Sequence, residues 1–185
     1  MKKRKLYQAV EDRDNPDEIE QKGPFMCKRK DAWLGHGYYF WDSFIELAHW
    51  WGGSSYDGNY VICLSHCDYT FPHTYDLYNC PEHLENFKVL SDSLGKEFPN
   101  KRITVCFVLE MLKSHSDFMT EFQAIRAKAD NCWRDVPHIP FVIRNFARLE
   151  MIPPIQICVL NKSFLIDGEY QIAELSQVNI HSSSD

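Results

Sequence analysis

The chain begins with an alternation of apolar and polar positions over residues 5–10, which predicts a β-strand. Residues 59–67 contain a near-continuous apolar run, which is typical of a strand covered on both faces. Residues 122–127 also alternate, and we assign them as a strand although good helix formers surround them. Turn-forming residues separate two further predicted strands near the end of the chain, over residues 155–160 and 170–180.

Helical spacing and helix-terminal residues predict four helices between these strands, over residues 15–22, 43–51, 81–94 and 103–113. Pro16 and Pro81 suit the first helical position, and Gly23 and Gly95 suit the position after the last turn. The glycine and serine residues at 52–55 are expected to end the second helix. The compact apolar run in the last of the four ranges fits a helix or a strand, and we favour the helix.

This order of elements predicts an α+β fold with a mainly antiparallel core. The 185 residues form most simply one domain, over residues 1–180, followed by a polar tail at 181–185. Residues 131–154 contain four prolines, which indicates an irregular excursion of the kind that often covers a site.

The composition is that of an ordinary globular protein, with 44% hydrophobic and 25% charged residues. A net charge of -6 argues against sequence-independent binding to a nucleic-acid backbone. No run of 18 apolar residues is present, and the basic start at residues 2–5 lacks the apolar stretch of a secretory signal. Seven cysteines without small-domain spacing fit a reducing compartment. We therefore expect a cytoplasmic protein that does not act on a membrane.

The residue types also suggest two other chemistries. One is a zinc site, for which the candidate ligands are Cys63, His66, Cys67, His73, Cys80 and His83. Their spacings match no compact zinc finger, so we expect no metal. The other is a nucleophile and base formed by Cys132 and His138, which nothing in the sequence places together.

The most distinctive stretch is residues 35–42, which read G-H-G-Y-Y-F-W-D. Two glycines around one residue permit close backbone approach, and the aromatic residues behind them can wall a pocket. Taken alone, the stretch also fits a tight turn with packed aromatic side chains. A second notable stretch, G-E-Y-Q-I, begins at residue 168 and continues to S-Q-V-N-I at residues 176–180.

Together these two stretches resemble the ADP-ribosyltransferase superfamily, in particular its diphtheria-toxin-like and poly(ADP-ribose)-polymerase-like branch. Gly35, Gly37, Tyr39 and Phe40 match that branch's G-x-G-x-Y-F segment, and Trp50 falls where a later aromatic residue is expected. Glu169 and Tyr170 match the start of its late catalytic strand. The resemblance implies a split, mainly antiparallel β-core with flanking short helices, and NAD as the substrate.

The resemblance also implies roles for individual residues. Glu169 is the implied catalytic carboxylate, which would stabilise the positive charge that develops on the ribose as the bond to nicotinamide breaks. Tyr39 would stack on the nicotinamide ring, with Trp50 or Tyr38 on its other face. Asp167 stands where relatives carry a residue that selects the acceptor.

Backbone groups near the same ring complete the implied site. Gly35 and Gly37, or Ala9, would bind the carboxamide through their main chain. Gln8 stands where the family carries a His or an Arg, and its amide could hold a ribose hydroxyl or the carboxamide.

The sequence therefore predicts a mono-ADP-ribosyltransferase that modifies a macromolecule, more readily a protein than a nucleic acid. The compact chain suits a bacterial or phage toxin, effector or defence protein. Two alternatives keep the same fold. One is a catalytically silent module that binds NAD or ADP-ribose, and the other is an NAD glycohydrolase that passes the ribosyl group to water.

Overall fold

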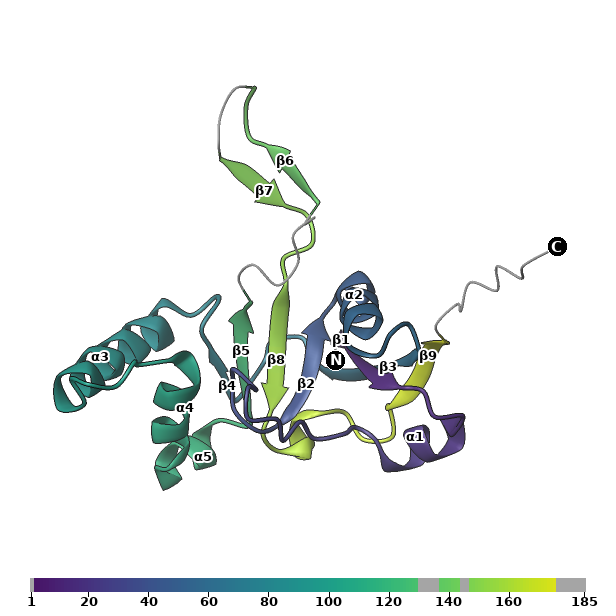
Figure 1. Ribbon diagram of the computed structural model, residues 1–185, viewed down its shortest axis with the longest axis horizontal. Helices are drawn as coiled ribbons and strands as arrows, with labels where there is room; N and C mark the ends of the chain where they lie inside the picture. Colours follow the sequence, from purple (N-terminus) through teal and green to yellow (C-terminus); the bar gives the residue numbers. More distant parts are fainter. Residues whose placement is uncertain (1, 130–136, 144–146, 176–185) are drawn as a thin grey trace.

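The computed structural model describes residues 2–129, 137–143 and 147–175. Its centre is a seven-stranded sheet in the order β4-β5-β8-β2-β1-β3-β9, in which only the β4–β5 pair is parallel (Figure 1). These strands are β1 (Lys3–Glu11), β2 (Tyr38–Asp42), β3 (Tyr60–Asp68), β4 (Thr74–Asp76), β5 (Ala124–Lys128), β8 (Ile155–Val159) and β9 (Gln171–Leu175). The fold is thus α+β with a mainly antiparallel sheet, as the sequence predicts.

Helices lie at both ends of the sheet and on one of its faces (Figure 1). The helices are α1 (Pro16–Lys22), α2 (Ile45–Ser55), α3 (Pro81–Glu97), α4 (Val105–Lys113), α5 (Ser116–Glu121) and the 3-10 turn η1 (Lys162–Phe164). Helices α3, α4 and α5 gather beside β4 and β5, whereas α1 lies near β9 and α2 contacts β1 and β3. A separate two-stranded sheet, β6 (His138–Pro140) and β7 (Arg148–Glu150), projects from the body between β5 and β8.

The predicted strands and helices are present, including the helix favoured at 103–113 and the strand at 122–127. Two predicted helix ends were wrong. Helix α2 continues through Gly52 and Gly53, and α3 continues through Gly95, because none of these glycines takes the positive φ that ends a helix. Gly52 instead allows the ring of Tyr60 to approach, since a Cβ there would lie 2.5 Å from a ring carbon. Only part of the predicted excursion at 131–154 and of the strand at 170–180 falls within the described residues.

The core lies on both faces of the sheet, because alternate side chains of each strand point to opposite faces. One face of β1, β2 and β3 packs on α2 through Tyr7, Trp41, Ile62 and Leu47. The opposite face is covered by the chain that follows β8, and its core includes Leu6, Phe40, Ile157 and Phe164. A third cluster packs β5 and β8 against α4 and α5, through Ile125, Cys158, Leu109 and Phe118.

The strands β1 and β2 pair over a short length only. Their backbone register includes Leu6 with Asp42 and Tyr7 with Trp41, and it does not extend to the rest of either strand. In contrast, β1 pairs with β3 along its whole length, from Lys3 to Glu11. The sheet therefore opens between β1 and β2 beyond Tyr7, and this opening positions the candidate site.

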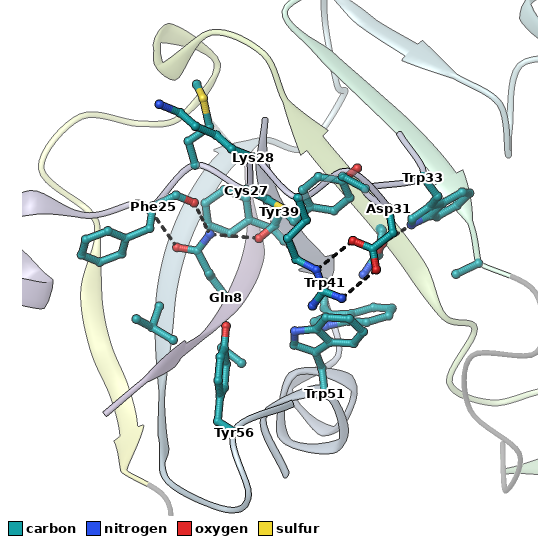
Figure 2. A pocket seen from close by; sticks show the side chains of 18 residues that line it. Gln8, Phe25, Cys27, Lys28, Asp31, Trp33, Tyr39, Trp41, Trp51 and Tyr56 are labelled. Atoms are coloured by element: carbon teal, nitrogen blue, oxygen red, sulfur yellow. Dashed lines mark hydrogen bonds and ion pairs between the residues drawn. The ribbon is translucent and has the colours of Figure 1, made fainter. Parts of the chain in front are cut away.

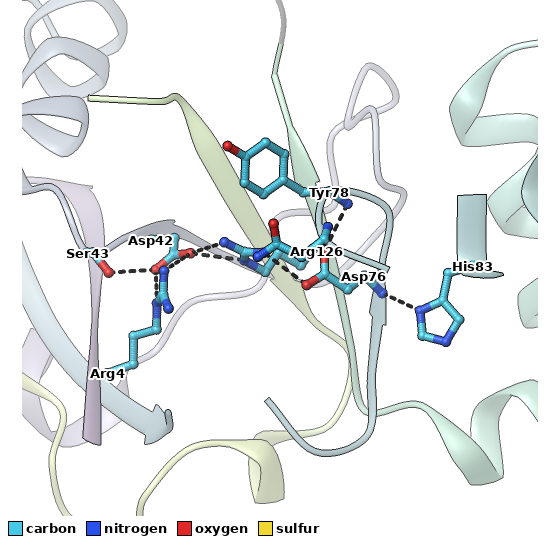
Figure 3. A network of polar contacts seen from close by, with 8 residues as sticks. Arg4, Asp42, Ser43, Asp76, Tyr78, His83 and Arg126 are labelled. Carbon is cyan, nitrogen blue, oxygen red and sulfur yellow. Dashed lines mark hydrogen bonds and ion pairs between the residues drawn. The ribbon is translucent and has the colours of Figure 1, made fainter. Parts of the chain in front are cut away.

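A buried ion network lies at the paired end of the same two strands (Figure 3). The carboxylate of Asp42 is fully buried and accepts hydrogen bonds from Arg4 and Arg126, at 2.5 to 3.0 Å. Arg126 also donates to Asp76 at 2.9 Å. The backbone N–H of Asp76 in turn donates to Nδ1 of His83 at the start of α3. This network ties β1, β2, β5 and β4 together across the sheet.

Candidate functional site

A cavity of about 640 Å³ occupies the opening between β1 and β2 (Figure 2). The segment that runs from Phe25 to Trp33 lies across it, and one turn of α2 and the ends of β5 and β8 complete its walls. Its size is that of an ordinary small-molecule site. The lining residues are Gln8, Ala9, Val10, Phe25, Met26, Cys27, Lys28, Arg29, Asp31, Ala32, Trp33, Tyr39, Phe40, Trp41, Trp51, Tyr56, Ala129 and Gln156.

Large aromatic side chains dominate the wall of this cavity. They come from four separate segments, namely Trp33 from the crossing segment, Tyr39 and Trp41 from β2, Trp51 from α2, and Tyr56 from the turn after α2. Figure 2 shows these rings around a common space. Such a wall offers flat, weakly polar surfaces on which another ring can stack.

Tyr39 is held rigidly in this wall. Its hydroxyl donates to the carbonyl of Gly35 at 2.8 Å and accepts from the backbone N–H of Leu34 at 2.9 Å. Burial raises the pKa of Tyr39 well above its usual value, so the phenol stays neutral. Tyr39 can therefore offer its ring to a ligand, but its hydroxyl is already used.

Gln8 also lines the cavity, and its amide is fully engaged within the protein. Nε2 donates to the carbonyl of Phe25 at 3.1 Å and to that of Tyr39 at 3.2 Å. Oε1 accepts from the N–H of Phe25 at 3.2 Å and from the hydroxyl of Tyr170 at 2.9 Å. An amide offers two donors and two acceptor sites, so Gln8 has none left for a ligand. Its role here is to join β1, β2 and the crossing segment.

Ala9 places backbone groups at the opening. The carbonyl of Lys5 faces β2, because it accepts from the N–H of Ser43. Alternate residues of a strand direct their backbone groups to the same side, so the N–H and C=O of Ala9 face β2 as well. Ala9 lies beyond the paired stretch, so these groups face the cavity and not a strand. The hypothesis that the backbone of Ala9 binds the carboxamide requires this placement.

The two glycines of the G-x-G segment do not line the cavity. Gly35 has φ +78°, a conformation that a side chain disfavours. Gly37 forms an isolated β-bridge with Cys27, and a Cβ at Gly37 would lie 2.8 Å from the carbonyl oxygen of Val159. The glycines thus serve a turn and a close contact with β8, rather than a ligand.

Three other predicted residues also lie outside the lining. Tyr38 points to the opposite face from Tyr39, since the two are neighbours on a strand, and its ring lies 5.1 Å from Nζ of Lys162. Trp50 packs edge-on against Trp41 with ring centroids 6.0 Å apart, while its neighbour Trp51 lines the cavity. Asp167 is exposed in the loop before β9.

The structure does not bring Glu169 to Tyr39. The carboxylate of Glu169 pairs with Lys3, and its other oxygen lies 2.9 Å from Nδ1 of His66. Ala9 is a residue of β1 that lines the cavity, and Lys3 lies six positions before it on the same strand. This spacing corresponds to roughly 20 Å along the strand. The strand that follows Glu169 is β9, which is separated from β2 by β3 and β1. The Lys3 ammonium lowers the pKa of Glu169, so the carboxylate is ionised and already paired at neutral pH.

Charged groups near the cavity come from the crossing segment. Lys28, Arg29 and Asp31 all line it, and all three are exposed. Arg29 and Asp31 form a bidentate pair with contacts of 2.9 and 2.7 Å. Lys28 and Arg29 thus bring two cationic side chains to the cavity wall.

Sequence reasoning missed two residues of the wall that are hydrogen-bonded to each other. Nε1 of Trp33 donates to Oε1 of Gln156 at 2.6 Å, although 123 positions separate them. Gln156 belongs to β8, which sequence reasoning recognised as a strand without any link to the glycine-aromatic stretch. The sequence signal that could have identified Gln156 is that it is the one polar residue in the otherwise apolar strand β8.

The described residues bear on the zinc alternative but not on the pair of Cys132 and His138. No group of three or more His, Cys, Asp or Glu side chains is placed to hold a metal ion in the part of the chain that the structure describes. Cys132 lies outside the described residues. No described helix is long and apolar enough to cross a lipid bilayer.

Comparisons with protein-family models, with curated proteins and with solved structures give no match.

Proposed function

We propose that the cavity between β1 and β2 binds NAD or a related nucleotide such as ADP-ribose, within a split, ADP-ribosyltransferase-like fold. The observation that carries this proposal is the aromatic cavity in the opening of the sheet, with Tyr39 and the backbone of Ala9 on its wall. A flat ring stacked against these side chains would gain on the order of 1 kcal/mol per face beyond the burial of its area.

The polar part of such a ligand has partners on the same wall. Lys28 and Arg29 extend from the crossing segment and are exposed, so they can approach the phosphates of a nucleotide. Arg29 would bind a phosphate at the expense of its pair with Asp31. The ring and the phosphates would thus be bound by different segments of the chain.

Among the three functions considered for this fold, namely a transferase, a glycohydrolase and a binding module, the geometry favours a module that binds NAD without cleaving it. Cleavage of the bond between ribose and nicotinamide needs a fixed carboxylate near the sugar. Asp31 is the carboxylate among the described lining residues, and it is exposed and paired with Arg29. Glu169 is paired with Lys3 and His66 away from the cavity.

Mono-ADP-ribosylation of a protein target is the second candidate. It is favoured by one observation, namely that Tyr39 and Ala9, which the sequence resemblance implies for NAD, both line one cavity. In that case Asp31 would have to leave Arg29 and act on the ribose.

Incubation with NAD labelled on its adenylate half separates these candidates. A binding module leaves NAD intact, with no label on protein and no free nicotinamide, in the presence or absence of cell lysate. Transfer of label, abolished in Asp31→Asn and retained in Glu169→Gln, would establish the transferase. Release of nicotinamide without transfer would establish a glycohydrolase. Failure of NAD and ADP-ribose to bind at all would overturn the proposal.

A further inference from the structure

Gln156 is a buried polar residue on the cavity wall whose position is fixed by its strand. Its backbone is paired with Trp41 of β2 on one side and with Ala127 of β5 on the other. The residue is only 8% exposed, and it contacts the cavity. A side chain anchored in this way cannot move far to meet a ligand, so its hydrogen-bonding groups are preorganised.

The hydrogen bond from Trp33 decides which way the Gln156 amide faces. An indole N–H only donates, so the atom of Gln156 that lies 2.6 Å from it must be the carbonyl oxygen. The NH₂ group of Gln156 is then directed away from Trp33. It has no hydrogen-bond partner among the described residues, and it is not sealed within the protein interior.

We propose that this NH₂ group is the specificity-determining donor of the cavity, and that it binds a carbonyl or carboxamide oxygen carried by a flat ring. The inference rests on the proposed function, in that the ring belongs to a nucleotide. A ligand that fills the cavity excludes water from this donor, and a desolvated donor is costly to leave unpaired, so a ligand that supplies an acceptor gains over one that does not. A neutral oxygen suits this place, because the amide N–H is a neutral donor and the cationic side chains of the wall, Lys28 and Arg29, are exposed whereas Gln156 is buried.

Two flat rings found in nucleotides carry an oxygen that can accept from this donor. A nicotinamide ring carries a carboxamide oxygen, and hypoxanthine carries a carbonyl oxygen at C6. Adenine carries an amino group at C6 in place of that carbonyl, and its acceptors there are the ring nitrogens N1 and N7, so it offers no exocyclic oxygen to Gln156. Trp33 acts as a positioning residue, because it holds the Gln156 amide in the orientation that directs the donor to the ligand.

Titration calorimetry with nicotinamide mononucleotide, IMP and AMP tests the inference. The parent protein is expected to bind the first two about tenfold more tightly than AMP, as one neutral hydrogen bond permits. Gln156→Met removes the donor without adding charge, and Gln156→Glu replaces it with an acceptor. Both variants are expected to lose that preference. Gln171→Met, at an exposed position of β9, is the matched control.

A spectroscopic measurement keeps the inference testable if a variant folds poorly. In a ¹⁵N-labelled sample, the side-chain amide pair that is absent from the Gln156→Glu spectrum should shift on addition of nicotinamide mononucleotide. Trp33→Phe, which keeps Gln156 but frees its amide, should reduce the preference for this ligand over AMP about threefold, and this ratio is the readout because a change in stacking affects both ligands.

The contrary outcomes distinguish a failure of the role proposed for Gln156 from a failure of the nucleotide site itself. A parent protein that binds AMP as tightly as IMP would overturn the role of Gln156 and leave the nucleotide site standing. An unmoved Gln156 amide at ligand saturation would do the same. Failure of all three nucleotides to bind would overturn the role of Gln156, and failure of NAD and ADP-ribose as well would overturn both proposals together.

Discussion

The side-chain amide of Gln8 donates to the backbone carbonyl of Tyr39 over 3.2 Å, at the point where β1 and β2 no longer pair through their backbones. The same amide holds Phe25 at the start of the segment that crosses the cavity. A residue expected to bind the ligand therefore shapes the cavity instead.

Replacement of Gln8 by Leu should lower the free energy of unfolding by roughly 2–4 kcal/mol, because Phe25, Tyr39 and Tyr170 would lose their partners. Urea unfolding measures this change. Gln171→Leu, on the exposed strand β9, should change stability by less than about 0.5 kcal/mol. Equal effects of the two substitutions would show that the Gln8 hydrogen bonds do not hold the opening.

Asp42 is expected to be the most sensitive charged position of the sheet. Asp42→Asn leaves Arg4 and the buried Arg126 without their shared carboxylate, which should cost about 3–5 kcal/mol. The exposed pair of Asp92 and Lys88 provides the control, and Asp92→Asn should leave stability nearly unchanged because exposed ion pairs contribute little. Thermal unfolding of both variants is sufficient, and a loss below about 1 kcal/mol in Asp42→Asn would contradict the network's structural role.

The second glycine of the G-x-G segment gives a prediction that separates structure from binding. Gly37→Ala should lower the free energy of unfolding by about 1–3 kcal/mol, because the added Cβ would meet the sulfur of Cys158 and the backbone of Val159. Gly53→Ala, in α2, meets nothing within 4 Å and should stabilise by about 0.5–1 kcal/mol. If Gly37→Ala folded as stably as the parent but no longer bound nucleotide, this glycine would belong to the site after all.

Buried thiols make stability depend on alkaline pH. Burial raises the pKa of Cys67 and Cys158 to about 12, from 9.0 in the unfolded chain. Above pH 9 the unfolded chain can release these protons and the folded protein cannot, so stability is complete below pH 9 and is lost as pH rises toward 12. Each thiol should contribute a slope of about 1.4 kcal/mol per pH unit. Urea unfolding between pH 8 and 10.5 should show a shallower decline for Cys158→Ala, and identical slopes would contradict this origin.

The sequence predicted the elements of the fold better than their arrangement. Residues 5–10 and 155–160 carry local patterns that identify β1 and β8, but no local pattern reveals which strands become neighbours in the sheet. The placement of Glu169 depends on that order, since β9 pairs with β3 at the edge of the sheet and not with β2.

The site was predictable only where it depends on local sequence. The family resemblance of two local stretches, residues 5–10 and 35–42, implied Ala9 and Tyr39, and both line the cavity. Trp33 and Gln156 were not, because their hydrogen bond joins segments that are remote in sequence. The turn and packing requirements that explain Gly35 and Gly37 produce the same G-x-G pattern as a ligand site, so the pattern alone could not separate the two.

The most direct test of the central claim is calorimetric titration of NAD and ADP-ribose into the parent protein, Trp51→Leu and Trp50→Leu. Trp51 lines the cavity and Trp50, its neighbour in α2, does not. We predict binding of one nucleotide per chain, weakened at least about tenfold in Trp51→Leu and by less than about twofold in Trp50→Leu. Absence of binding to the parent, or equal losses in the two variants, would contradict a nucleotide site between β1 and β2.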